Sequence, residues 1–221
     1  MKRLIAVLVV VGMASAMAIA LSASAPVATQ TEIVLPAPVT KGTMSLEEAL
    51  AKRRSIRGFE SKALTQQQVG QLLWAAQGIT DPATGHRTAP SAMARYPMTV
   101  WMFDATGVYK YQPKGHLLIK ISDQDRRAEV TQPARGGSAA PVTFILTGDP
   151  SVFGGRGADM AQKFIYLEGG HIAQNLALEA TALGLATVTQ GGINAAKIAA
   201  AVSLPEGAVA VYALPVGYAA R

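Results

Sequence analysis

The chain has no cysteine in its 221 residues, so disulfides, thiolate metal ligands and a cysteine nucleophile are all excluded. Charged residues make up only 15% and aromatic residues 6%, whereas 50% of the residues are hydrophobic. This balance excludes a disordered polyelectrolyte and suits a globular chain with one sizeable core. The length fits roughly one domain, because domains usually hold about 100–200 residues.

The excess of basic residues is also small, with a formal net charge of +6 that includes Lys2 and Arg3 at the extreme N-terminus. A nucleic-acid-binding surface needs clustered basic residues together with aromatic side chains that stack on bases. The aromatic residues here are few and scattered. We therefore expect no nucleic-acid partner and only a mild preference for anionic ligands.

The usual catalytic motifs are missing as well. The chain has no G-x-S-x-G elbow, no H-E-x-x-H pair, no GxxxxGK[ST] loop and no G-x-G-x-x-G turn. His86, His116 and His171 are far apart and have no carboxylate at metal-ligand spacing, so each is interpreted as a locally hydrogen-bonded residue and no metal site is expected. With no nucleophile, base or metal at hand, the pattern indicates that a bound cofactor supplies the reactivity.

The N-terminus has the layout of a secretory signal, in which Lys2 and Arg3 precede an apolar run and several small residues through Ala25. We expect residues 1–25 to be removed on export, to the periplasm or outside the cell. The alternative is an uncleaved membrane anchor, because the uncharged stretch 4–21 just reaches the length of a short span. Residues 26–44 hold three prolines and no sustained periodicity, which favours an extended linker.

The remaining residues, 45–221, are predicted to form one domain with mixed helices and strands. Ser45 with Glu48, and Thr65 with Gln68, each match a capping box at the start of a helix. Because helices and strands do not alternate strictly, the pattern favours an α+β fold over a doubly wound sheet. Strands are predicted at 100–103, 117–121, 141–147 and 208–216, and further helices at 159–185 and 194–201.

The densest group of cations is Lys52 to Arg57, with four basic residues and the Ser55 hydroxyl among six positions. Guanidinium groups with a neutral donor beside them suit a phosphate. The alternative is an ordinary solvated basic patch. Three further segments are candidates for a ligand site: the small residues Thr88 to Ala92, the strand end Thr187 to Gly192, and the terminal Arg221. Taken alone, these are equally consistent with a turn, a strand terminus and a disordered end.

Taken together, six blocks in this order resemble the nitroreductase-like FMN flavoproteins, and most closely the SagB-type, thiazole/oxazole-forming dehydrogenases. The blocks are RRSIRGF at 53–59, LLWAAQGIT at 72–80, HRTAPSAMARYP at 86–97, GVYKYQPKGHLL at 107–118, APVTFILTGD at 140–149 and the stretch 169–192. The resemblance implies an α/β/α sandwich with a mixed, largely antiparallel sheet and long central helices. It also implies a homodimer that binds FMN at the subunit interface.

The resemblance also implies roles for single residues. Arg53 and Ser55 would bind the FMN phosphate, Arg54 the phosphate or ribityl oxygens, and Arg57 the pyrimidine edge. A departure follows the block's Ala92, because family members often continue Gly-Ala-Leu-Tyr-Pro where this chain has Met93 to Pro97. Because of that difference, the substrate preference of the family is not carried over to this chain. The residues implied to line the isoalloxazine are Pro90, Ser91 and Ala92, from either subunit, with Thr189, Gly191 and Gly192, and Arg221 is a further phosphate ligand.

The reaction implied by the resemblance is a ping-pong hydride transfer through flavin N5, from NAD(P)H to a nitroaromatic or quinone-type acceptor. One alternative is a dehydrogenase that oxidises an azoline or related substrate. A second alternative is a flavin-binding module without turnover, and a third is a scaffold whose basic run meets acidic partners. Exported proteins meet little nicotinamide, so a quinone or a partner redox protein is a further candidate donor or acceptor.

Overall fold

Strand β7 (Val142–Gly148) is buried along its whole length, because its run of β-branched and apolar residues faces packed layers on both sides. The computed structural model describes residues 31–131, 139–155 and 157–220. The expected leader and Arg221 lie outside these residues. In the described residues β7 lies within a seven-stranded sheet of order β1-β6-β5-β4-β7-β9-β8.

The neighbours of β7 are antiparallel to it. β4 (Met98–Asp104) and β9 (Val209–Gly217) each pair with β7 over seven register positions. Beyond β4 come β5 (Gly107–Gln112) and β6 (Leu117–Ser122), and the short β8 (Ala186–Thr187) pairs with the end of β9. The strands predicted at 100–103, 117–121, 141–147 and 208–216 are confirmed to within a few residues.

Four strands, β1, β2, β3 and β5, were not predicted. β5 follows β4 directly, and β2 (Ile79–Asp81) pairs with β3 (His86–Arg87) around Gly85, whose φ of +76° suits glycine. β1 (Glu32–Val34) lies in the stretch expected to be a linker. It is extended as expected, but it pairs with β6 at the edge of the sheet.

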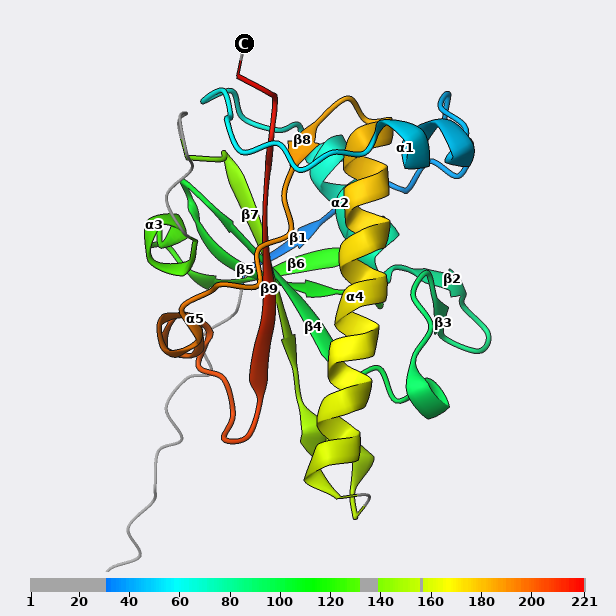
Figure 1. Cartoon of the computed structure of the whole chain (residues 1–221), viewed down its shortest axis with the longest axis vertical. Helices are drawn as coiled ribbons and strands as arrows, with labels where there is room; N and C mark the ends of the chain where they lie inside the picture. Colours follow the sequence, from blue (N-terminus) through cyan, green and yellow to red (C-terminus); the bar gives the residue numbers. More distant parts are fainter. Residues whose placement is uncertain (1–30, 132–138, 156, 221) are drawn as a thin grey trace, which may run out of the picture.

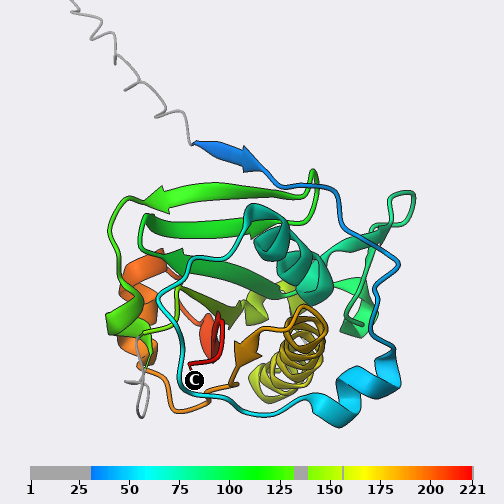
Figure 2. The same cartoon turned by 90° about the horizontal axis from the view of Figure 1, so that it is seen from above.

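One face of the sheet is covered by α2 (Gln66–Gln77) and the 25-residue α4 (Ala158–Ala182), which lie side by side (Figures 1 and 2). The predicted capping box at Thr65 and Gln68 is present, and Gly78 is the C-cap of α2. Between these helices and the sheet lies the larger hydrophobic cluster, which includes Leu72, Phe144, Ile165 and Leu176.

The opposite face packs against α3 (Arg127–Val130) and α5 (Ala195–Val202), with Phe103, Ile145 and Ile198 buried between them and the sheet. Asn194 caps α5 as predicted, because its side chain accepts a hydrogen bond from the Lys197 N–H. The two helical layers confirm the α/β/α sandwich, and Figure 2 shows them on either side of the sheet.

The remaining helices are short. α1 (Leu46–Lys52) begins at the predicted Ser45 cap and lies outside the C-terminal end of α4. Two 3₁₀ turns, η1 (Ala92–Ala94) and η2 (Pro150–Phe153), follow the 86–91 segment and β7. Within residues 31–131, 139–155 and 157–220, none of the helices has the length and apolar character that crossing a membrane requires.

Candidate functional site

The arginine loop, residues 53–57, leaves the C-terminal end of α1 with its cations unpaired. Arg54 uses its Nη1 to donate to the carbonyls of Ala51 and Arg53, at 2.9 and 2.7 Å, so it helps to cap the helix. Among the described residues, no carboxylate forms an ion pair with Arg53, Arg54 or Arg57. Three guanidinium groups without a counter-ion in one loop form a site for an anion.

Hydrogen bonds fix the arginine loop to the end of β8. The Ile56 N–H donates to the Thr187 carbonyl at 2.9 Å, and Ser55 forms a parallel bridge with Thr187. Thr187 is itself buried and donates from Oγ1 to the Pro215 carbonyl at 2.9 Å. The loop is therefore anchored to the sheet although the side chain of Ser55 is exposed.

The end of the chain returns to the same place. The Glu60 N–H donates to the Tyr218 carbonyl at 2.9 Å, and the Ala220 N–H donates to the Gly58 carbonyl at 3.1 Å. These bonds place residue 220 beside the arginine loop. Arg221, predicted as a phosphate ligand, lies outside the described residues.

A second group of predicted residues, Thr189, Gly191 and Gly192, follows β8 and is exposed. Gln190 holds this turn in place, because its N–H and C=O both bond to Ala213, at 2.8 and 3.0 Å. In the described part of the chain the Gly191 N–H has no acceptor. A side chain at Gly191 would meet only the Tyr212 ring, at 3.7 Å, so the main chain is open to a ligand.

Gln190 was missed by the sequence interpretation. Its Oε1 atom is buried and has no hydrogen-bond partner among the described residues. A buried, unpaired amide oxygen is uncommon in a folded protein and calls for an explanation such as an absent ligand. The signal was weak, because a lone glutamine before two glycines looks like any polar strand end.

The arginine loop and the glycine turn lie along one strand. Thr187 pairs with Val216 of β9, and Gln190 bridges Ala213, three residues earlier. At about 3.4 Å per residue these points are about 10 Å apart. An elongated ligand with an anionic end and a flat end would span them, with its phosphate at the arginines and its ring at the glycines. The residues present therefore fit FMN.

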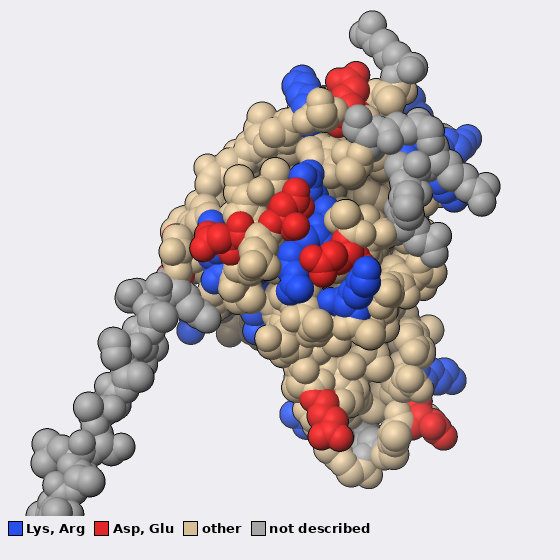
Figure 3. Space-filling view, turned by 90° about the vertical axis from the view of Figure 1, so that its left-hand side faces the viewer, with Lys and Arg blue, Asp and Glu red and all other residues tan. Residues whose placement is uncertain are grey.

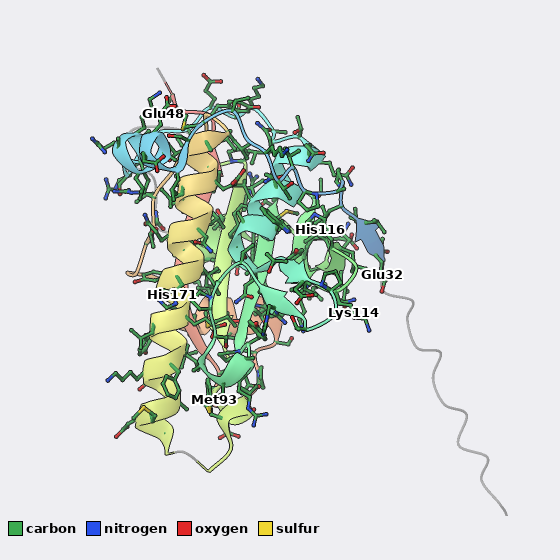
Figure 4. The ribbon with its side chains drawn as sticks, turned by 90° about the vertical axis from the view of Figure 1, so that its right-hand side faces the viewer. Glu32, Glu48, Met93, Lys114, His116 and His171 are labelled. Carbon is green, nitrogen blue, oxygen red and sulfur yellow. The ribbon has the colours of Figure 1, made fainter. Side chains whose placement is uncertain are left out.

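The third predicted segment, Pro90 to Ala92, is not beside the other two. It follows β3 on the opposite side of α4 from β8, as Figure 1 shows. The Thr88 carbonyl accepts a hydrogen bond from Asn175 of α4 at 3.3 Å, which fixes the start of this segment. In Figure 4, Met93 lies toward the N-terminal end of α4 and Glu48 beyond its other end. One chain therefore does not bring all the predicted residues together.

A buried polar chain lies beneath this third segment and was also missed. Arg87 Nη1 donates to Gln77 Oε1, and Gln77 Nε2 donates to Glu168 Oε1, both at 3.1 Å. Burial raises the pKa of the Glu168 carboxyl, while Ser91, Gln77 and Arg87 act in the opposite direction. The only sequence signal was a single acidic residue in the apolar stretch 164–173.

The outward face of α4 is uncovered in a single chain. Tyr166 is 50% exposed and Leu167 is 53% exposed, and a Cβ added at Gly170 would meet nothing within 4 Å. The neighbouring Gly169 is different, because its Cβ would lie 2.8 Å from Val211. Glycine costs about 1 kcal/mol relative to alanine inside a helix. No close contact within the described part of one subunit requires a glycine at position 170.

The described residues offer neither a metal-binding cluster nor, on the face seen in Figure 3, a uniformly basic surface. Within the described ranges, His, Asp and Glu side chains form no group of three that could bind a metal ion. The face with α3 and α5 has basic and acidic side chains side by side, without a uniformly basic area (Figure 3). Among the described residues, ion pairs join Lys120 to Asp123, Arg126 to Glu129, and Arg127 to Asp125.

Comparisons with known proteins agree with this geometry. The model of the nitroreductase family matches residues 50–218. A protein of Methanocaldococcus jannaschii, assigned by name to the nitroreductases, is 37% identical over 161 residues, covering 67% of this chain and 79% of that one. A solved structure from Ralstonia eutropha, with the same assignment, has a TM-score of 0.80 at 29% identity, covering 86% of this chain and 90% of that one.

A chain of the Escherichia coli microcin synthetase complex, solved with truncated pro-MccB17 bound, has a TM-score of 0.67 at 20% identity. It covers 77% of this chain and 70% of that one, and the likeness concerns the fold alone. The family model spans the arginine loop, the glycine turn and the 86–97 block, so it includes the described residues of the candidate site. The chain belongs to the nitroreductase family of oxidoreductases, whose members generally bind FMN.

Proposed function

We propose that this protein is an FMN-dependent oxidoreductase that works as a homodimer and transfers hydride equivalents from NAD(P)H to a nitroaromatic or quinone-type acceptor. The observation that supports this proposal best is the placement of two candidate ligand-binding segments, the arginine loop and the glycine turn, along β9. Among the described residues, the guanidinium groups of the arginine loop have no counter-ion and the Gly191 N–H has no acceptor. The two segments are held beside β9 positions, Val216 and Ala213, that are about 10 Å apart.

Each residue of the arginine loop has a role in this proposal. Arg53 and Ser55 bind the phosphate, and Arg54 adds the guanidinium nitrogens that its helix cap leaves over. Arg57 is exposed, and its Nη1 approaches only the Ser55 carbonyl, at 3.5 Å, so it can turn to the pyrimidine edge. Arg221 is proposed as an additional phosphate ligand, because Ala220 ends beside Gly58.

FMN, when bound, supplies the two-electron hydride chemistry that no side chain of this protein provides. The protein positions the flavin ring and tunes its reactivity. The Gly191 N–H is a fixed donor for the ring edge at N5, and Thr189 and Gly192 are exposed on either side of it. The Gln190 Oε1, which lacks a partner among the described residues, is a further candidate acceptor for an N–H of the ring. Solvent then supplies protons, so an acid/base pair is not needed.

A dimer would explain why the Pro90 to Ala92 segment lies apart from the other predicted site residues in one chain. Solved relatives with this fold are typically dimeric. In a second copy packed against the face of α4 with Tyr166, Leu167 and Gly170, the Pro90 to Ala92 segment of one subunit would approach the glycine turn of the other. The absence of a side chain at Gly170 would then permit close approach of the two helices, which a single chain does not require.

A second candidate function is oxidation of an azoline or related substrate, as in SagB-type dehydrogenases. The block 86–97 supports it, as does the fold shared with a chain of the microcin synthetase complex. A flavin-binding module without turnover is the third candidate. Photoreduction followed by stopped-flow reoxidation separates this module from an enzyme, because a pure binder shows no step that an acceptor accelerates.

We also propose export of the protein, with residues 1–25 as a cleaved leader or an anchor and a quinone or redox protein as an alternative electron partner. N-terminal sequencing of the protein from its native host tests the leader. An intact Met1 would contradict cleavage and favour the anchor.

The deciding experiment uses leaderless protein reconstituted with FMN. We expect a yellow dimer that oxidises NADPH under anaerobic conditions when menadione is present. A yellow dimer that consumes no NADPH would remove the nicotinamide donor but retain the cofactor. A colourless protein, at any reasonable FMN concentration, would overturn the flavin assignment.

A further inference from the structure

The loop of residues 91–96, which overlaps the segment Pro90 to Ala92 proposed to line the flavin, has an unusual backbone. Met93, Ala94 and Tyr96 have φ values of 55°, 51° and 49°, a left-handed region that side chains other than glycine and asparagine rarely adopt. Three such residues within four positions persist only if their surroundings hold them there. Such strain is concentrated at functional sites, so the groups that hold this loop are of interest.

Apolar packing holds only the start of the loop, where Ala92 contacts the larger hydrophobic cluster. Met93, Ala94 and Arg95 are exposed, and a cavity of about 230 Å³ lies beneath Tyr96, lined also by Arg87 and Tyr111. Two backbone hydrogen bonds shape its middle, from the Ala94 N–H to the Ser91 carbonyl and from the Arg95 N–H to the Ala92 carbonyl, both at 3.1 Å. Two contacts that involve side chains close the loop. The Tyr96 N–H donates to Ser91 Oγ at 2.8 Å, and the Arg87 guanidinium carbon lies 4.3 Å from the centre of the Tyr96 ring. Arg87 therefore positions the C-terminal end of the loop.

Arg87 is held in turn from α4. Gln77 bridges Arg87 to Glu168 through two hydrogen bonds of 3.1 Å, so the opposite charges are joined by an amide and not by direct contact. Glu168 is only 2% exposed. Its carboxylate also lies near Ser91, the first residue of the loop. The chain Arg87–Gln77–Glu168 thus reaches both ends of the loop from two packed helices, α2 and α4.

Stability alone does not require these charges. Replacing a buried charged pair with apolar side chains of similar size is often neutral or stabilising. Here Arg87 Nε and Glu168 Oε2 are buried and lack hydrogen-bond partners among the described residues, which adds a cost. A buried polar chain with unsatisfied atoms, directly beneath a strained loop, is better explained by what it directs the loop to do.

We propose that Arg87 and Glu168 are positioning residues: through Gln77, Tyr96 and Ser91 they hold the strained 91–96 loop so that Pro90 to Ala92 meets the flavin bound by the second subunit. This inference rests on the proposed function. It assigns the Arg87–Gln77–Glu168 chain a role in the geometry of the interface site, and neither residue touches the cofactor.

The test replaces the whole polar chain in the full dimer, with Gln77→Met, Arg87→Met and Glu168→Met combined. The urea midpoint and the dimer mass should stay close to those of the parent, because no charge is left unpaired. Hydrogen exchange of the Tyr96 amide should become about tenfold faster, since the bond to Ser91 opens more often. The visible circular dichroism of bound FMN should change, and FMN should bind about five- to tenfold more weakly.

Lys110→Met is the matched control. Lys110 lines the same cavity, and the substitution removes one positive charge, as Arg87→Met does. Its Nζ lies over the Trp101 ring and does not contact the Tyr96 ring. It should leave both exchange at Tyr96 and the flavin dichroism unchanged. If the triple variant keeps parental exchange and dichroism, the polar chain is structural only and the inference is wrong.

A second variant, Tyr96→Leu, tests the inference if the triple variant fails to fold. Tyr96→Leu removes the ring that Arg87 holds, at a half-buried position, and leaves the polar chain intact. It should reproduce the faster exchange across 91–96 and the altered dichroism, and unchanged values would overturn the inference. If the parent protein binds no FMN, the proposed function fails by that result alone. Exchange at Tyr96 in the cofactor-free variants then still reports whether the chain holds the loop.

Discussion

Ile56 and Thr187 are 131 residues apart, yet the N–H of the first donates to the carbonyl of the second at 2.9 Å. This bond joins the arginine loop to the strand end that precedes the glycine turn. Because Thr187 is also bonded to Pro215 of β9, the loop, β8 and β9 form one rigid unit. The two predicted contacts of the cofactor, phosphate and ring, are therefore fixed relative to each other before any ligand arrives.

Arg53→Ala is expected to weaken FMN binding by about 1.5–3 kcal/mol, the contribution of a hydrogen bond to a charged group. The dissociation constant is measured by the quenching of FMN fluorescence on titration with cofactor-free protein. Arg126→Ala is the control, since it removes the same charge from a pair with Glu129 that has no role in the proposed site. Equal affinity of Arg53→Ala and the parent would exclude the phosphate role.

Local signals predicted much of this fold. Ser45 and Thr65 mark helix starts because each hydroxyl bonds to a backbone N–H three residues on. The strand β5 was missed although Tyr109 and Tyr111 alternate with Lys110 and Gln112, the period of two that marks a half-buried strand. β1 was missed because three residues in a proline-rich stretch give no period, and only its pairing with β6 makes them a strand.

The site was harder to predict than the fold. The six blocks indicated which segments belong to it, but not on which side of α4 each one lies, because that depends on the order of strands in the sheet. Gln77 and Glu168 are 91 residues apart, and each looks like an ordinary polar residue of a helix. Their partnership arises from the packing of α2 on α4, which no local pattern reports.

Gly170→Leu should separate folding from dimerisation. The change replaces a helical glycine with a good helix former in open space, so each subunit should gain about 1 kcal/mol of stability. A leucine in a close helix contact should weaken the dimer, as sedimentation over a range of protein concentrations would measure. Gly169→Ala is the contrasting variant, because its Cβ meets Val211 and should destabilise each subunit by about 1–3 kcal/mol. A Gly170→Leu dimer as tight as the parent would contradict the proposed interface.

Thr147→Val should destabilise the fold by about 1–3 kcal/mol, because Trp101 Nε1 donates to Thr147 Oγ1 at 2.8 Å and both residues are buried. The substitution keeps the shape but leaves the indole N–H without an acceptor. Urea unfolding measures the loss. In a Trp101→Phe background the same substitution should have little effect, since no donor remains, and a full loss there would attribute the effect to packing.

His116 should make stability depend on pH in the acidic range. Its Nδ1 shares a hydrogen bond of 2.9 Å with the Tyr111 hydroxyl, while Nε2 is buried and lacks a hydrogen-bond partner among the described residues. Burial lowers the pKa of His116 below its ordinary 6.5, an effect that the Pro36 carbonyl partly offsets.

Between the lowered pKa and 6.5 the unfolded chain binds more protons than the folded one, so the free energy of unfolding rises with pH through this window and levels off above it. His116→Gln removes the ionisation. The stability of the parent relative to this variant, from urea unfolding at pH 5 to 8, should therefore increase up to about pH 6.5. A difference that stays constant with pH would mean that His116 titrates alike in both states, as an exposed imidazole would, and the ring could not then be sealed beside Tyr111.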